Sequence, residues 1–172
     1  MEAGFRTCPV TGLKVHLPAE RLIVINFVMA IIFLLTGGLF ALLMVLTRAP
    51  AIKLLDPATY YIALTGHGVA MLILWIIWFE IAAIIFVSTV LLNARIFSVT
   101  LGWLAFVLMF LGSLLGAGAI LSGKASIAFT AYPPLVGHPA FYLGYVLFAF
   151  GALVAILNFF LTIGKARAEG TF

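Results

Sequence analysis

Long apolar stretches alternate with short polar connections along this chain of 172 residues. Four such stretches cover residues 22–47, 59–92, 96–122 and 139–164. Each is longer than the roughly 20 residues that a helix needs to cross about 30 Å of hydrocarbon. Apolar runs of this length are typical of membrane-spanning helices and not of soluble cores. The pattern therefore predicts an all-α bundle of four transmembrane helices over 22–164, with tails at 1–21 and 165–172.

The composition points to lipid as the solvent for much of the exterior. Hydrophobic residues make up 66% of the chain and charged residues 8%, whereas an ordinary soluble domain carries roughly 25% charged residues. A net charge of +4 would favour nucleic acid as a partner of a soluble protein. Here the basic residues lie almost wholly between the apolar stretches, where they set topology and contact anionic lipid heads. We expect membrane lipids, and no nucleic acid, as partners.

The connections contain residues that interrupt helices. Pro50 and Pro57 bound the first connection, and the pair Pro133-Pro134 lies in the third. Proline cannot donate a hydrogen bond into a helical ladder, so these segments are natural breaks. The first apolar stretch is long enough to span and follows about twenty mixed residues, so we expect no cleaved signal peptide. The second stretch would be about 50 Å long as a helix, so we expect it to tilt or project.

The basic residues predict the orientation of the bundle. Three of them fall on the side opposite the termini, namely Arg48, Lys53 and Lys124. Six fall on the side of the termini: Arg6, Lys14, Arg21, Arg95, Lys165 and Arg167. Because cytoplasmic loops carry the excess of Lys and Arg, both termini are predicted in the cytoplasm.

Small residues gather where helices would meet. They are Gly37 and Gly38 in the first stretch, Gly112, Gly116 and Gly118 in the third, and Gly144 and Gly151 in the fourth. Small side chains let helix backbones approach closely, and they also leave room for a flat ligand. Helix packing explains most of these positions, and a planar cofactor against the same faces is the alternative.

His67 is the polar residue with the clearest chemical potential. Polar groups inside a membrane are expensive, so each requires a partner or a function. A neutral imidazole at this depth suits an axial ligand of haem iron, and the flanking Gly66 and Gly68 would give a macrocycle room beside the helix. From the residues alone, an interhelical hydrogen bond is the simpler interpretation, and both remain open.

Three other residues have weaker signals. His138 is expected at a helix end, near the interface. Glu80, inside the second stretch, is either a proton carrier or a protonated side chain that hydrogen-bonds across helices. Cys8 is the only cysteine, so the chain can form neither an internal disulfide nor a thiolate cluster. Phosphate-binding glycine loops, dinucleotide fingerprints and HExxH motifs are absent from the sequence, so we expect no catalytic residue of a self-contained soluble type.

Two segments together resemble subunit I of haem-copper oxidases, specifically the B-family or ba-type branch. The first is YYIALTGHGV at residues 60–69, which is similar to the stretch of that family containing the low-spin haem histidine. The second is YPPLVGHPAFYLG at residues 132–144, which resembles the loop that runs into the fourth helix. The two occur in the expected order with one whole helix between them.

This resemblance implies a site and a function. His67 would be an axial ligand of a low-spin haem, of the b type, on the outer side of the membrane. Gly66 and Gly68 would lie beside that haem, and Tyr132 with its loop would lie near the haems on the same face. The family normally places the second ligand, the high-spin haem and the copper histidines on later helices, which are not in this sequence.

The expected role is therefore part of a respiratory terminal oxidase with a split subunit I, in a prokaryotic cytoplasmic membrane. A second polypeptide would supply the opposite face of the haem, the high-spin haem and copper, and a copper-containing subunit II-like protein would deliver electrons. The chain would not be catalytic alone. Two alternatives remain: a subunit of a nitric oxide reductase-like complex, and a membrane scaffold or anchor that keeps the fold without haem.

Overall fold

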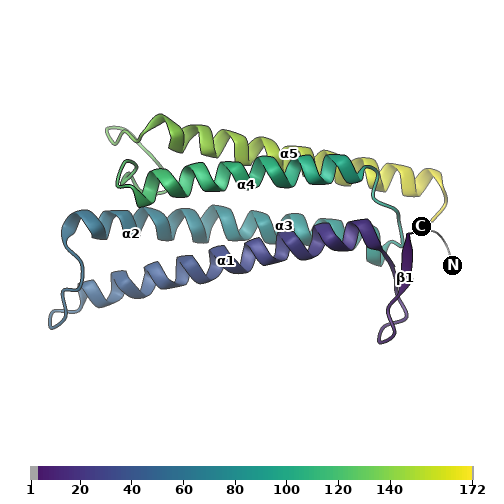
Figure 1. Cartoon of the computed structure of the whole chain (residues 1–172), viewed down its shortest axis with the longest axis horizontal. Helices are drawn as coiled ribbons and strands as arrows, with labels where there is room; N and C mark the ends of the chain where they lie inside the picture. The colour runs from purple at the N-terminus through teal and green to yellow at the C-terminus, as the bar shows by residue number, and fades with distance from the viewer. Residues whose placement is uncertain (1–3, 172) are drawn as a thin grey trace.

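The computed structural model describes residues 4–171 and consists of four long helical runs lying side by side (Figure 1). Their bounds are α1 Leu17–Arg48, then α2 Pro57–Val69, η1 Ala70–Leu74, α3 Trp75–Phe86 and η2 Val87–Leu91 as one run, then α4 Val99–Leu121 and α5 Pro139–Ala168. All four runs are long and apolar enough to cross a membrane. The prediction of an all-α membrane bundle with four spans is confirmed.

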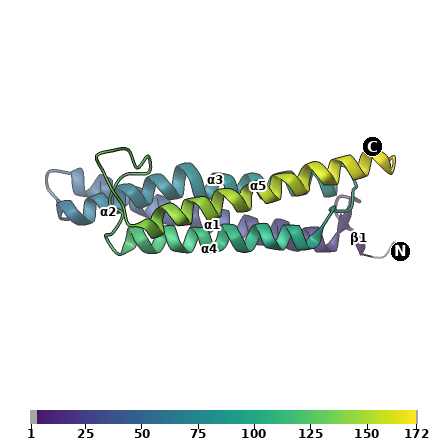
Figure 2. The ribbon, with the colours of Figure 1, turned by 90° about the horizontal axis from the view of Figure 1, so that it is seen from above.

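Both ends of the described chain lie at the same end of the bundle, as Figures 1 and 2 show from two directions. The connections between α1 and α2 and between α4 and α5 lie at the opposite end. An even number of spans requires this arrangement. We call the end with the termini the terminal end and the other the distal end.

Two of the helical runs begin directly after a residue whose side chain caps them. The Asp56 carboxylate accepts hydrogen bonds from the amides of Ala58 and Thr59, at 3.0 and 3.2 Å, so the second run begins at Pro57 and not at residue 59. The Ser98 hydroxyl accepts from the amide of Leu101, so α4 begins at Val99 and not at residue 96. Such side chains satisfy amides that have no partner within the helix. A proline at the first position needs no such acceptor.

The second run is not a uniform α-helix. The segments η1 and η2 are π-helical, and each interrupts the α-helical ladder. An apolar run has the same composition in α- and π-helical form, so the sequence predicted one continuous helix. Segments of this kind occur frequently at functional sites, and η1 begins three residues after His67.

The N-terminal segment contains a β-hairpin, where the sequence predicted only a tail. Strands β1 Phe5–Thr7 and β2 Lys14–His16 pair antiparallel, with Phe5 opposite His16. Arg6 donates two hydrogen bonds to the carboxylate of Glu20, and the guanidinium of Arg95 lies 5.3 Å from the centre of the Phe5 ring. These contacts fasten the hairpin to the terminal end of the bundle.

Helices α4 and α5 pack backbone to backbone. A Cβ atom added to Gly112 would lie 2.5 Å from the amide nitrogen of Phe148 and 2.6 Å from the carbonyl oxygen of Gly144. One added to Gly144 would lie 2.7 Å from the amide nitrogen of Gly116, and one added to Gly151 would lie 2.8 Å from the carbonyl oxygen of Ala105. Glycine is required at these positions because no side chain fits between the two backbones. Helix packing, and not a cofactor, accounts for these glycines.

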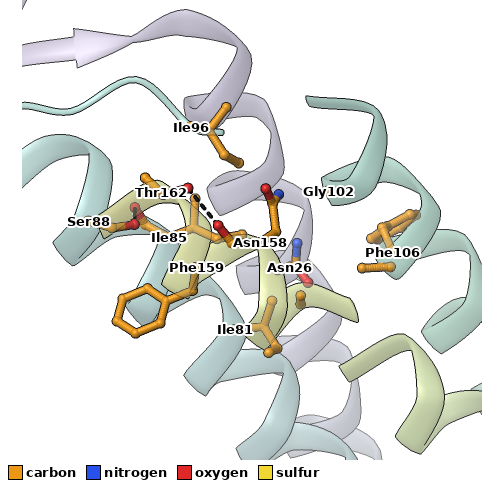
Figure 3. A pocket seen from close by; sticks show the side chains of 12 residues that line it. Asn26, Ile81, Ile85, Ser88, Ile96, Gly102, Phe106, Asn158, Phe159 and Thr162 are labelled. Atoms are coloured by element: carbon orange, nitrogen blue, oxygen red, sulfur yellow. Dashed lines mark hydrogen bonds between the residues drawn. The ribbon is translucent and has the colours of Figure 1, made fainter. Parts of the chain in front are cut away.

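A buried polar group joins the two helices at the terminal end. The Asn158 side chain accepts from the amide of Ser98 at 3.1 Å and donates to the carbonyl of Ser98 at 2.9 Å. Thr162 accepts from the amide of Phe97 at 2.9 Å. Figure 3 shows Asn158 and Thr162 in a small cavity that Asn26 of α1 also lines. The bonds hold the segment before α4 against α5.

Candidate functional site

His67 lies in α2, ten residues after the helix begins at Pro57. At 1.5 Å per residue it is about 15 Å from the distal end of its helix. Its Nδ1 atom lies 2.9 Å from the carbonyl oxygen of Gly37 in α1, thirty residues away in sequence. The imidazole is half-buried. The histidine therefore makes an interhelical hydrogen bond, as the simpler interpretation of the sequence expected.

The same bond defines the tautomer of the ring. A carbonyl oxygen only accepts, so Nδ1 of His67 must carry the hydrogen, and Nε2 of the neutral ring then carries the lone pair. Within residues 4–171, no hydrogen bond reaches Nε2. Metal-binding histidines commonly donate one ring N–H to a backbone carbonyl and bind the metal with the other nitrogen. The hydrogen bond and the ligand role thus use opposite nitrogens and are compatible.

Glycines on both helices bring the chain close around the imidazole. A Cβ atom on Gly37 would lie 2.6 Å from the sulfur of Met71. One on Gly66 would lie 2.7 Å from the Phe40 ring, and one on Gly68 would lie 2.9 Å from Cβ of Phe129. Side chains of this chain therefore use the space in front of Gly66 and Gly68. Contact of a macrocycle with these two glycines stays a prediction.

The distal loop, residues 122–138, folds onto α2 beside the histidine. The amide of Ala128 donates to the hydroxyl of Thr65 at 2.9 Å, and the hydroxyl of Tyr145 donates to the carbonyl of Phe129 at 3.3 Å. Tyr132, in contrast, is 70% exposed. Among residues 4–171, no hydrogen bond or ring contact joins it to His67. Ala128 and Phe129 therefore hold the loop against α2 near His67, whereas Tyr132 lies in an exposed part of the loop.

An apolar hollow of about 90 Å³ lies beside Gly66 and Phe40, between α1, the second run and α4. His67 is not one of its lining residues. They are Phe33, Thr36, Phe40, Gly66, Val69, Ala70, Leu74, Ala117, Ile120 and Leu121. Thr36 uses its hydroxyl to donate to the carbonyl of Ile32. The hollow therefore suits apolar material and offers no ligand for a metal.

The other polar residues singled out by sequence lie away from this site. His138 is the residue before α5, and its Nδ1 accepts from the amide of Ala140 at 3.2 Å, so it acts at a helix end as expected. Glu80 is exposed on α3. Cys8 lies after β1, where a hydrogen bond from the Thr11 side chain and backbone amides lower the pKa of its thiol to about 7.

Sequence reasoning missed several residues that build the site. Gly37 was identified only as a small residue for helix packing, although its carbonyl orients the imidazole. Phe40, Thr65 and Phe129 were not identified at all. Periodicity shows that Phe40 and Thr65 lie in helices but not which helix each one faces. The Phe129 loop has no regular pattern from which its partner could be inferred.

The metal-binding side chains that the structure describes near His67 can provide one axial bond to a haem iron, but they cannot hold a metal ion by themselves. Among residues 4–171, no group of three His, Cys, Asp or Glu side chains lies close enough together to hold a metal ion. A single imidazole with a free Nε2 is sufficient for one axial position of a haem. The residues present therefore fit a haem that is held from one side by this chain.

Comparison with known protein families shows to which family this four-helix bundle belongs. The family model described as Cytochrome C and Quinol oxidase polypeptide I matches residues 21–172. The chain belongs to this family. The resemblance to haem-copper oxidase subunit I is confirmed at that level.

The known proteins to which this chain is similar include subunits of both cytochrome c oxidases and quinol oxidases. "Cytochrome c oxidase subunit 1" of Thermus thermophilus is 32% identical over 146 residues, which cover 81% of this chain and 26% of the relative. "Quinol oxidase subunit 1" of Bacillus subtilis is 29% identical over 162 residues, which cover 88% and 25%. An uncharacterized protein of Aquifex aeolicus is 32% identical over 134 residues, which cover 77% and 32%.

A solved structure of a related protein is similar to this chain in fold and in sequence. A chain from the cryo-EM structure of a "heme-copper terminal oxidase dimer" superposes with a TM-score of 0.75 and 28% identity. The match covers 81% of this chain and 24% of that chain. The chain thus spans about a quarter of the length of these oxidase subunits.

Proposed function

We propose that this chain is the N-terminal portion of a split subunit I of a respiratory terminal oxidase, and that His67 is one axial ligand of a low-spin haem b. The observation that carries the proposal is the bond from Nδ1 of His67 to the Gly37 carbonyl, which leaves Nε2 for iron. Family membership supports the choice of haem over other ligands. The resemblance of residues 60–69 and 132–144 to the ba-type branch supports haem b.

In this proposal the residues of this chain bind the haem on one side and orient its ligand, and the partner chain completes the site. Haem iron bound at Nε2 supplies one-electron redox chemistry. The Gly37 carbonyl accepts the hydrogen bond from Nδ1 and holds the imidazole in one orientation, and such a bond raises the basicity of a histidine ligand. Phe40 packs against Gly66 and Phe129 packs against Gly68, on the helix that bears His67. Gly66 and Gly68 allow these rings to approach, and Tyr132 would lie in the loop nearest the haems.

The rest of the oxidase would come from other polypeptides. A second chain would supply the opposite axial ligand, the high-spin haem and the copper site, and a copper-containing subunit II-like protein would deliver electrons. The chain spans 26% of the Thermus thermophilus relative and 24% of the solved subunit, and the proposal assigns the remaining parts to other polypeptides. Dioxygen reduction would then occur in the assembled complex.

The charge distribution supports an orientation in a prokaryotic cytoplasmic membrane. Six of the nine Lys and Arg residues fall on the terminal side and three on the distal side. By the positive-inside rule both termini would be cytoplasmic. His67 lies about 15 Å from the distal end of its helix. It would therefore be nearer the outer face, from which an external donor delivers electrons.

Replacement of His67 tests the proposal in the complex purified with its partner chains. The variant His67→Ala is expected to lose the low-spin haem absorption bands, and the haem content by pyridine haemochrome should fall by about one haem per complex. His138→Ala is the matched control, because His138 acts at a helix end. It should keep the spectrum. Low-spin bands that persist unchanged in His67→Ala would overturn the assignment, and a complex without haem would favour a scaffold.

A further inference from the structure

Glu80 is an ionisable residue on the outside of a membrane span. Its side chain is exposed on α3, and within residues 4–171 it makes no hydrogen bond and no ion pair. In this it differs from Glu20, which pairs with Arg6, and from Glu169, which pairs with Lys165. Ionisable groups within spans almost always face protein or a water-filled cavity, because hydrocarbon solvates them poorly.

The packing of α3 on α1 locates Glu80 along the membrane normal. Its neighbour Phe79 contacts Phe27 of α1, with ring centres 5.2 Å apart. Arg21, the nearest basic residue of α1, precedes Phe27 by six residues, or about 9 Å along the helix. The helical run that bears Glu80 ends eleven residues later, at Leu91, which is up to about 16 Å away. A short glutamate side chain therefore reaches neither Arg21 nor the end of its own helical run.

The surface around Glu80 is otherwise apolar. The exposed residues of the same run include Leu72, Phe79 and Phe86 at seven-residue intervals, together with Val87. A row of large apolar side chains with one polar group is a surface that a second transmembrane helix can cover. In such interfaces, side-chain hydrogen bonds between helices add to close packing.

We propose that the face of α3 around Glu80 is the docking surface for a transmembrane helix of the partner polypeptide, and that this helix places a hydrogen-bond donor or a cation against the Glu80 carboxyl. The inference rests on the proposed split subunit for the identity of the partner. Family membership supports that occupant, because about three quarters of each matched oxidase subunit lies outside the part that resembles this chain and can supply such a helix. Lipid offers no donor within the hydrocarbon.

A photo-crosslinking experiment in membranes that contain the assembled complex tests the docking surface. The reactive residue p-benzoylphenylalanine replaces Phe79, which is aromatic, exposed and adjacent to Glu80. The expected adduct joins this chain to a polypeptide whose peptides, identified by mass, belong to later helices of an oxidase subunit I. An adduct with lipid alone, or with a second copy of this chain, overturns the proposal.

Second-site variants test the role of the carboxyl. With the crosslinker in place, Glu80→Leu should lower the adduct yield at least about fivefold, the effect expected for one lost polar contact between helices. Glu80→Gln keeps hydrogen-bonding capacity and should retain the yield, as should Leu72→Ala, which trims the same face without changing charge. Equal yields in Glu80→Leu and the parent overturn the proposal. If Glu80→Leu does not accumulate, the identity of the parent adduct and the Glu80→Gln yield decide.

The haem spectrum of the same samples separates this inference from the haem assignment. If His67→Ala loses the low-spin bands and the Phe79 adduct remains, both proposals stand. If His67→Ala keeps the bands and the adduct still forms with the later helices, only the haem assignment fails. A lipid adduct together with loss of the bands in His67→Ala overturns only the docking surface.

Discussion

The two halves of the bundle pack by different means. In the α4–α5 pair, Gly112, Gly144 and Gly151 bring backbone against backbone, with no space for a further atom. In the pair of α1 with the second run, the glycines face side chains: Gly37 faces Met71 and Gly66 faces Phe40.

This difference separates a closed half from an open one. Contacts between two helix backbones are rigid, because backbone atoms within a helix have no rotamers with which to adjust. Contacts to a methionine or phenylalanine side chain adapt by rotamer changes. The adaptable half holds His67, the π-helical segments and the exposed Glu80 face. In the proposed oxidase, α4 and α5 would form the fixed frame, and the half with α1 would receive the haem and the partner helices.

The largest effect is expected where a side chain enters the closed half. Gly112→Ala places a Cβ atom 2.5 Å from the amide nitrogen of Phe148, so the helices must separate, at a cost of about 3 kcal/mol or more. Unfolding of the purified protein in detergent measures the loss. Gly118→Ala in the same helix is the control, because nothing lies within 4 Å of its Cβ position. If both variants are equally stable, the closed half is not close-packed.

An intermediate effect is expected where the closed half is held by hydrogen bonds. Asn158→Leu removes both bonds to Ser98 and leaves its amide and carbonyl without these partners. We expect the free energy of unfolding to fall by about 2 kcal/mol, measured by the same denaturation. Leu157→Ala changes an exposed neighbour and should stay within about 0.5 kcal/mol of the parent. Similar stabilities of the Leu variant and the parent would contradict a structural role for the cluster.

The smallest effect is expected where the open half can adapt. Gly37→Ala meets the flexible end of Met71 at 2.6 Å, so a rotamer change should limit the destabilisation to about 1 kcal/mol. The double variant Gly37→Ala, Met71→Ala should recover part of this loss. Gly38→Ala, with nothing within 4 Å of its Cβ position, serves as control. A loss as large as that of Gly112→Ala would remove the distinction between the two halves.

The bundle itself could be predicted well from the sequence, and its details less so. Four spans were correctly identified, because each apolar stretch carries its own signal. The helix ends differed by up to five residues, as at Leu17, where α1 begins before the predicted residue 22. That difference arises because the hairpin at residues 5–16 leads directly into α1 and its contacts are not visible in hydropathy. The π-helical segments η1 and η2 were missed because an apolar run can have the same composition in α- and π-helical form.

The candidate site was predictable in its central residue and not in its surroundings. His67 could be singled out because an imidazole is rare within an apolar span, and its motif resembles a known family. Its partner Gly37 lies thirty residues earlier, and Phe129 lies in an irregular loop of a later connection. No local pattern relates such residues.

The length of an apolar stretch is a local property, and each helix satisfies its own backbone hydrogen bonds. The amino-acid sequence alone was therefore enough to predict the four spans and to place an imidazole inside one of them. Which helix faces meet depends on side chains from distant parts of the chain. The Gly112–Gly144 contact, the bond between His67 and Gly37 and the outward direction of Glu80 therefore became visible only in the folded molecule.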